Sequence, residues 1–168
     1  MRPILMSIFA TILSAGSALA DDAGVNANYD RMSAAYEAED ASALEKVYAP
    51  EAIVFPSQPN APWVVGREHI VKGPGALLAK ARSERGALQI RFRVTGRQTF
   101  GSIIIDTGLY RLSIAGPAGK DSVQVGKFMT VSERQPDGTW AFVADTDTPM
   151  PTAAWDGAKP FAGAKFDH

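Results

Sequence analysis

The sequence contains no cysteine and only two histidines among its 168 residues. Without cysteine there can be no disulfide, no thiolate nucleophile, no lipid-modified cysteine and no cysteine-based metal site. With only His69 and His168 available, a histidine-rich zinc site is not expected either. We therefore expect no cofactor or metal, and a fold that depends on its hydrophobic core.

The sequence also lacks an excess of positive charge and any phosphate-binding motif. The formal net charge is −1, whereas proteins that bind nucleic acid carry a basic surplus. The Gly73-Pro74-Gly75 segment has neither the lysine nor the spacing of a phosphate-binding loop. Ser57 lies outside any Gly-x-Ser-x-Gly motif, so a serine nucleophile of that kind is not expected. We expect no nucleic-acid partner.

The most apolar stretch lies at the N-terminus. Arg2 is followed by an apolar run over residues 4–13, and Ala18-Leu19-Ala20 precedes Asp21. This order is typical of a secretory signal peptide with an A-x-A cleavage site. The alternative, a membrane anchor, needs about 20 apolar residues, more than this run provides. We expect residues 1–20 to be cleaved, and the mature protein to be periplasmic or secreted without a membrane partner.

Helical patterns dominate the first half of the remaining chain. Val25, Tyr29, Met32 and Tyr36 recur at helical spacing. A second helix is predicted from about Asp40 or Ser42 through Tyr48, where Pro50 stops it. A short strand at residues 52–55, a return strand at 63–65 and a third helical region at 67–83, divided at 73–75, follow.

Long strands dominate the second half. Residues 89–100, 102–116, 122–135 and 139–148 are rich in β-branched and aromatic residues and are separated by short turns. Such spacing favours an antiparallel meander with the helices on one face, which is an α+β fold. We expect one domain over residues 21–149. The Pro-, Gly- and Ala-rich tail of residues 150–168 is expected to be loosely ordered, or to lie along the body or a neighbouring subunit.

Several segments together resemble the nuclear transport factor 2-like superfamily. They are AYEAEDASALEKVYAPEAIVF, GREHI, IDTGLYRLS and GKFMTVSERQPDGTWAFVADT, within residues 26–149. The branch they resemble is a bacterial domain of unknown function related to SnoaL-like and ketosteroid-isomerase-like proteins. The resemblance implies a cone, or cystatin-like α+β roll, in which the curved sheet wraps the N-terminal helices around a pocket. It also implies a homodimer.

The resemblance does not carry over the steroid-isomerase chemistry. In isomerases of this fold a carboxylate removes a proton beside a carbonyl, and a tyrosine and a protonated acid hold the oxyanion. The corresponding positions here are Pro56, Met32 and Thr130, none of which can take those roles. Fold resemblance without the site does not establish the activity.

Asp145 and Lys127 are the polar residues that could replace that site. Asp145 sits where the resembled branch ends its last strand in Asp, and Lys127 is the lysine of its Gly-Lys-aromatic segment. Adjacent strands could bring the two side chains together inside the cone, where the lysine would hold the acid ionised. The alternative is a partly exposed structural ion pair. Asp145 is the catalytic candidate, and both residues are candidate ligand contacts.

Apolar side chains are expected around the same cavity. The candidates are Met32, Tyr36, Phe55, Trp63 and Tyr110, although aromatic residues at such positions also form ordinary core.

Basic residues outside this set are expected to face solvent. His69 follows Gly-Arg-Glu at a helix start, where it could be a base at the pocket mouth or a solvated residue. Arg91, Arg93 and Arg97 form a stripe on one strand, which favours a solvated sheet face over an anion site.

Three functions are compatible with these patterns. The first is an exported domain that binds a small, mainly apolar molecule in its cone. The second is a SnoaL-like or isomerase-like enzyme that uses Asp145 in a rearranged acid–base site. The third is an interaction module that docks a partner through the sheet face or the tail.

Overall fold

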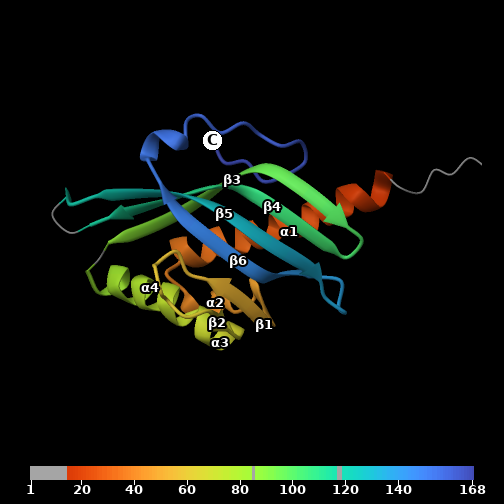
Figure 1. Cartoon of the computed structure of the whole chain (residues 1–168). Coiled ribbons are helices and arrows are strands. Elements are labelled where there is room, and N and C mark those ends of the chain that lie inside the picture. The colour runs from red at the N-terminus through yellow and green to blue at the C-terminus, as the bar shows by residue number, and fades with distance from the viewer. Residues whose placement is uncertain (1–14, 85, 117–118) are drawn as a thin grey trace, which may run out of the picture.

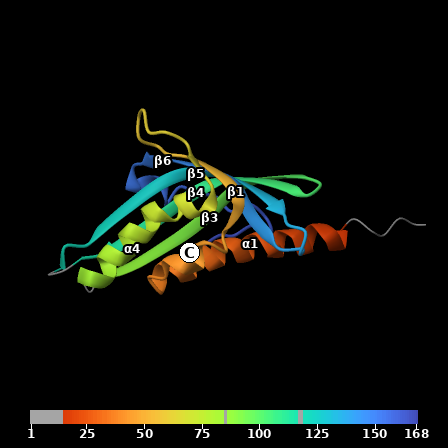
Figure 2. The same ribbon diagram turned by 90° about the horizontal axis from the view of Figure 1, so that it is seen from below.

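A computed structural model describes residues 15–84, 86–116 and 119–168 and shows a long curved sheet over one long helix (Figures 1 and 2). The helices are α1 (Ala15–Glu37), α2 (Ala41–Leu44), α3 (Arg67–Ile70) and α4 (Lys72–Glu84), with a 3-10 turn, η2, at Thr152–Ala154. The strands are β1 (Tyr48–Phe55), β2 (Val64–Val65), β3 (Ala87–Phe100), β4 (Ile103–Ala115), β5 (Ser122–Arg134) and β6 (Trp140–Met150).

The strands form one six-stranded sheet in the order β2-β1-β6-β5-β4-β3. The four long strands form the predicted antiparallel meander, and the predicted α+β class is confirmed. One junction differs from the expected antiparallel sheet, because β1 pairs with β6 in parallel. The chain reaches β6 from β1 through the two helices α3 and α4 and the whole meander, which is a connection long enough for parallel pairing.

Helix α1 packs its apolar side against the concave face of the sheet (Figure 1). The predicted stripe of Val25, Tyr29, Met32 and Tyr36 is buried, with 8% or less of each residue exposed. The Tyr29 ring lies 5.0 to 5.8 Å from three phenylalanine rings of β3, β5 and β6. These tilted ring contacts join one helix residue to three strands.

The segment after α1 is less helical than predicted. α2 spans only Ala41–Leu44, capped by the Asp40 carboxylate, and Tyr48 begins β1 instead of ending a helix. Tyr48 pairs with Phe142 of β6 and is buried, so pairing with the sheet outweighs the local helical pattern. The third helical region is divided at Val71 and not at residues 73–75. Pro74 is accommodated in the first turn of α4, where its missing N–H costs nothing.

A bulge in β3 turns Arg97 into the interior. The pairing register with β4 shifts between Val94 and Gly96, so Arg97 faces the same side as Val94 although three positions separate them. The Arg97 guanidinium donates to both Asp106 carboxylate oxygens at 2.7 Å and to Asp22 at 2.8 Å. The prediction of a solvated stripe is therefore wrong for Arg97, because the bulge reverses the alternation on which it rested.

The C-terminal tail is packed against the body, so the prediction of a loosely ordered tail is wrong. The Val94 amide donates to the Lys165 carbonyl and the Asp167 amide donates to the Phe92 carbonyl, so the tail covers the free edge of β3. The Arg93 guanidinium lies 4.2 Å from the Trp155 ring and 5.0 Å from the Phe166 ring. These cation–π contacts give the tail aromatics a binding partner that its composition does not reveal.

The predicted signal segment lies largely outside the described residues, which begin at residue 15. Helix α1 runs through Ala20, the last residue of the predicted signal peptide. Cleavage after Ala20 stays a prediction. The two residues after it have partners in the domain: Asp21 forms an ion pair with Arg134, and Asp22 forms one with Arg97. None of the described helices is long and apolar enough to cross a membrane.

Loss of the Arg97 guanidinium should strongly destabilise the fold. We expect Arg97→Met to lower the free energy of unfolding by about 3–5 kcal/mol, because the Asp106 carboxylate would remain buried without its partner. Arg91→Met is the matched control on the same strand. Among the described residues the Arg91 side chain bonds only Gln89, and we expect a loss of under about 1 kcal/mol. Urea denaturation of both variants tests this, and equal losses would contradict it.

Candidate functional site

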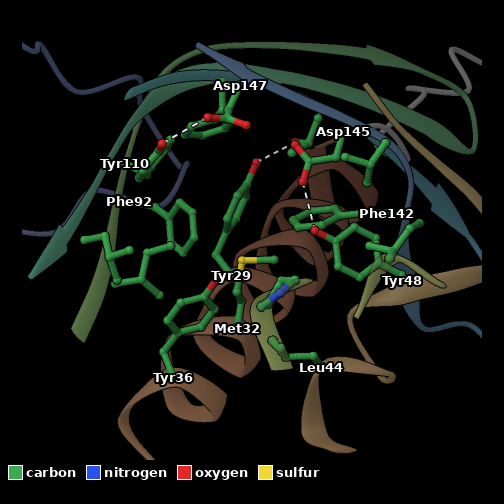
Figure 3. Close-up of a pocket in the computed structure, with 17 residues that line it drawn as sticks. Tyr29, Met32, Tyr36, Leu44, Tyr48, Phe92, Tyr110, Phe142, Asp145 and Asp147 are labelled. Carbon is green, nitrogen blue, oxygen red and sulfur yellow. Dashed lines mark hydrogen bonds between the residues drawn. The ribbon is translucent and has the colours of Figure 1, made fainter. Parts of the chain in front are cut away.

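A cavity of about 240 Å³ lies between α1 and the concave face of the sheet (Figure 3). It is bounded by α1, by β1 and α3 on one side and by β3 to β6 on the other. Its walls are mostly apolar and aromatic, and they include Tyr29, Tyr36, Phe92, Tyr110 and Phe142. A concave, mainly apolar site with a few polar groups is the usual form of a small-molecule pocket.

Two carboxylates of β6 form the polar end of the cavity. Asp145 and Asp147 are two positions apart on the strand and therefore share its inner face. The Tyr48 hydroxyl donates to Asp145 at 2.9 Å, and the Tyr110 hydroxyl donates to Asp147 at 3.0 Å (Figure 3). Each carboxylate thus has one tyrosine partner from a different strand.

The environment of Asp145 favours its protonated form. Burial raises the pKa of the Asp145 carboxyl, the Tyr48 hydrogen bond opposes that rise, and the charge of Asp147 adds to it, giving a pKa of about 6. Burial and the Asp145 charge also raise the pKa of Tyr48 well above its usual range. Near neutral pH Asp145 can therefore exchange a proton while Tyr48 stays a neutral donor.

Tyr29 links this cavity to the buried ion pair. Its hydroxyl donates to Asp106 at 3.0 Å and lies 2.7 Å from the Thr130 hydroxyl. Burial and the charge of Asp106 raise the pKa of Tyr29 well above its usual range, so it remains a phenol. Because Arg97 holds Asp106 from behind, the orientation of the Tyr29 ring is fixed by charged groups outside the cavity.

The fourth tyrosine of the cavity, Tyr36, directs its hydroxyl into the open space. The residue is 8% exposed, and its hydroxyl points toward the middle of the cavity without a hydrogen bond to any described residue (Figure 3). Burial, with smaller contributions from the charges of Asp145 and Asp147, raises the pKa of Tyr36 to about 12. The cavity therefore contains a neutral hydroxyl that can bond a bound molecule.

Gly126 explains how Tyr110 reaches the site. The two residues are directly paired across β4 and β5, and a Cβ at Gly126 would overlap the Tyr110 ring. Without a side chain at this position the ring can lie over β5 and reach Asp147 on β6. The glycine of the Gly-Lys-aromatic segment thus makes room for a cavity tyrosine.

Solved structures with the same architecture come from several bacteria. An NTF2-like protein with a cystatin-like fold from Novosphingobium aromaticivorans is 14% identical, with a TM-score of 0.70 over 88% of this chain and 95% of that one. An NTF2-like superfamily protein from Salmonella enterica is 13% identical, with a TM-score of 0.64 over 82% and 96%. The protein has the nuclear transport factor 2-like fold.

A ketosteroid isomerase-like protein from Erwinia carotovora atroseptica has the same fold at 11% identity, with a TM-score of 0.59 over 78% of this chain and 97% of that one. No protein-family model matches the chain, and no curated protein matches it. At these identities the likeness establishes the NTF2-like fold and not an activity.

The NTF2-like fold places four of the sequence-predicted site residues at the cavity. Met32, Tyr36, Tyr110 and Asp145 all line it. Of the positions transferred from steroid isomerases, Met32 and Thr130 also line it, whereas Pro56 follows the end of β1 and does not.

The prediction was wrong for two aromatics. Phe55 and Trp63 are 38% and 70% exposed and pack edge to face with ring centroids 5.3 Å apart. Neither lines the cavity; on β1 it is Val54 that faces inward, so strand alternation directs Phe55 outward.

The predicted pair of Lys127 and Asp145 does not form. Asp145 is opposite Thr130 on β5, and both line the cavity. Lys127 lies three positions before Thr130, which puts its side chain on the outer face of the sheet, where it is exposed. The sequence did not fix the pairing register of β5 and β6, and the observed register places the Lys127 and Asp145 side chains on opposite faces of the sheet.

Sequence reasoning missed three of the polar residues that line the cavity: Tyr29, Tyr48 and Asp147. Asp147 had a usable signal, since every second residue of a strand shares one face with Asp145. Tyr48 had none, because its segment was predicted to be helical. His69 is exposed beside Glu68 and Lys72 and does not line the cavity. Among the described residues no three His, Cys, Asp or Glu side chains form a group that could hold a metal ion.

Removal of the Asp145 carboxyl should change how stability depends on pH. The carboxyl titrates near 4 when unfolded and near 6 when folded, so between these values the folded state binds more protons and stability falls as pH rises. We expect Asp145→Asn to stabilise the protein, relative to wild type, by about 1–3 kcal/mol more at pH 7.5 than at pH 4.

Urea denaturation at both pH values measures the difference. Asp156→Asn, which alters an exposed carboxyl, is the control and should show no such change. A stability difference between Asp145→Asn and wild type that stays constant with pH would contradict the raised pKa.

Proposed function

We propose that the protein binds a small, mainly apolar molecule that carries a hydrogen-bonding group. The aromatic walls favour an apolar body, and the polar groups gather at one end (Figure 3). The volume of about 240 Å³ exceeds that of an apolar cavity of about 150 Å³ known to accommodate benzene. A ring of that size with a short polar substituent fits this space.

The observation that carries the proposal is the free hydroxyl of Tyr36. The Tyr36 residue is largely buried, and its hydroxyl opens into the cavity without a hydrogen bond to a described residue. Each of the other three cavity tyrosines donates a hydrogen bond to a carboxylate of the protein, so Tyr36 differs from the tyrosines beside it. A ligand that covers this hydroxyl and leaves it unpaired would cost about 1–3 kcal/mol, so the cavity should favour a molecule that carries a group able to bond Tyr36.

Acid–base catalysis at Asp145 is the second candidate. A general acid or base works best with a pKa near the working pH, and Asp145 has a pKa of about 6 beside a neutral tyrosine donor. The position differs from the one implied by steroid isomerases, because it lies on β6 and not after β1. The enzyme would therefore use a rearranged site within the same cone.

Partner docking by the tail is less favoured than either function. The tail bonds the edge of β3, and Lys165 also forms ion pairs with Asp30 and Asp167. A partner that bound the tail would first have to displace these contacts. Export and homodimer formation stay predictions from the sequence.

Ligand binding can be tested with two molecules of matched shape, cyclohexylmethanol and methylcyclohexane. Both should raise the melting temperature of the wild type through binding to the folded state. We expect Tyr36→Phe to lower the affinity for the alcohol about 3- to 10-fold, the equivalent of one hydrogen bond. The affinity for methylcyclohexane should stay nearly unchanged. Trp63→Phe, outside the cavity, is the control. Failure of both molecules to bind, or equal alcohol affinity in Tyr36→Phe, would contradict the proposal.

Catalysis can be tested by following exchange of the α-hydrogens of cyclohexanone in D₂O by NMR. The wild type should accelerate exchange, with a rate that rises through about pH 6 as Asp145 becomes ionised. We expect Asp145→Asn to reduce the rate at least about 100-fold, whereas Asp156→Asn leaves it unchanged. If Asp145→Asn retains the wild-type rate, Asp145 is not the base.

A further inference from the structure

We propose that the ligand is an organic cation, an apolar body bearing a protonated amine whose ammonium group lies between Asp145 and Asp147. The inference rests on the proposed binding function and names the chemical class of the ligand. It follows from the charges, the unused hydrogen-bond capacity and the aromatic walls of the cavity.

The charges of the lining are all of one sign. Asp145 and Asp147 are carboxylates, and among the described residues that line the cavity there is no lysine, arginine or histidine. Arg97 lies behind Tyr29, and Asp106 and Asp22 already bind its guanidinium. A cation would therefore meet uncompensated negative charge in a poorly hydrated site, where charges interact strongly. An anionic ligand would add a third negative charge and should be rejected.

The hydrogen-bond groups point to the same ligand. An ionised carboxylate has about four acceptor sites, and each of these two accepts one tyrosine hydroxyl. Alternate residues of a strand share one face, and both carboxylates line the same cavity, so they open toward a common space. An ammonium group has three donors and no acceptor, so it can bond both carboxylates at once.

The aromatic rings around these carboxylates would add to the attraction. Tyr29, Tyr36 and Phe142 approach the same space from α1 and β6 (Figure 3). A cation within about 6 Å of an aromatic face is attracted by the electron-rich ring, and more strongly where water is excluded. Such walls suit both the apolar body and the charged end of an alkylammonium ion.

Binding of an amine should depend on pH through Asp145. The titratable groups that face it are Tyr48 of β1, Tyr29 and Tyr36 of α1, Tyr110 of β4 and Asp147 on its own strand. The tyrosines remain neutral at physiological pH because their pKa values are all raised. Between about pH 5 and 8 the titration of Asp145 should therefore set the affinity, which rises as Asp145 ionises.

The test compares three molecules with one apolar body: cyclohexylmethylamine, cyclohexylmethanol and cyclohexanecarboxylate, by titration calorimetry at about pH 7.5. We expect the amine to bind at least about 10-fold more tightly than the alcohol, and the carboxylate to bind most weakly. Lowering the pH to about 5 should reduce the affinity for the amine about 10-fold and the affinity for the alcohol far less, because only about a tenth of Asp145 then remains ionised.

Variants separate this inference from the proposed function. Asp145→Asn and, independently, Asp147→Asn should each lower the affinity for the amine about 10-fold and the affinity for the alcohol less than about 3-fold. Asp156→Asn, at an exposed carboxyl, is the control. The cation inference would be overturned if the amine bound no better than the alcohol, or if cyclohexanecarboxylate bound best. Either result would leave the proposed ligand binding intact. If none of the three molecules binds, the proposed function fails as well.

Discussion

The buried ion pair between Arg97 and Asp106 is the constraint on which the geometry of this cone depends. It lies in the interior, where a lone charge would be very costly, and each side chain satisfies the other with two hydrogen bonds. Asp106 also accepts the hydroxyl of Tyr29, and Arg97 also binds Asp22. Helix α1 is thereby tied to β3 and β4 at two places along its length.

This anchoring determines the shape of the cavity. Tyr29 is the residue at which the ion pair and the pocket meet, since its ring packs on phenylalanines of three strands while its hydroxyl is held by Asp106. One α-helical turn further along, Met32 and then Tyr36 face the open space instead of filling it. The cavity is therefore the region of the concave face that α1 spans without sealing, and not a packing defect.

The sequence predicted those parts of the fold that repeat a simple period. Val25, Tyr29, Met32 and Tyr36 identified the buried side of α1, and the four long strands were found with nearly correct limits. Errors arose where a single local event breaks the period. The bulge before Gly96 reversed the facing of Arg97, and pairing with β6 made Tyr48 a strand residue. Gly96 is compatible with a bulge, but Gly126 lies in a regularly paired stretch of β5, so glycine alone does not locate such an event.

The candidate site was only partly predictable, for a related reason. Asp145 was identified because the resembled family ends its last strand in Asp, and Tyr36 and Tyr110 were identified from their aromatic character. Lys127 was assigned to the wrong face because inward and outward positions differ by one residue of register. Contacts between distant strands, such as that of Tyr48 with Asp145, depend on a parallel junction that only the folded chain reveals.

Asp106 and Asp145 differ in a way that bears on function. Asp106 is fully compensated by Arg97 and Tyr29, so it contributes to a defined structure. Asp145 has only a tyrosine hydroxyl as a side-chain partner and a second carboxylate nearby, and its raised pKa means that ionisation opposes folding. A side chain that weakens the fold at neutral pH, in a cavity with a free hydroxyl, is poorly explained by stability alone. Local departures of this kind concentrate at functional sites, so the β6 carboxylates are where the chemistry of this protein is to be sought.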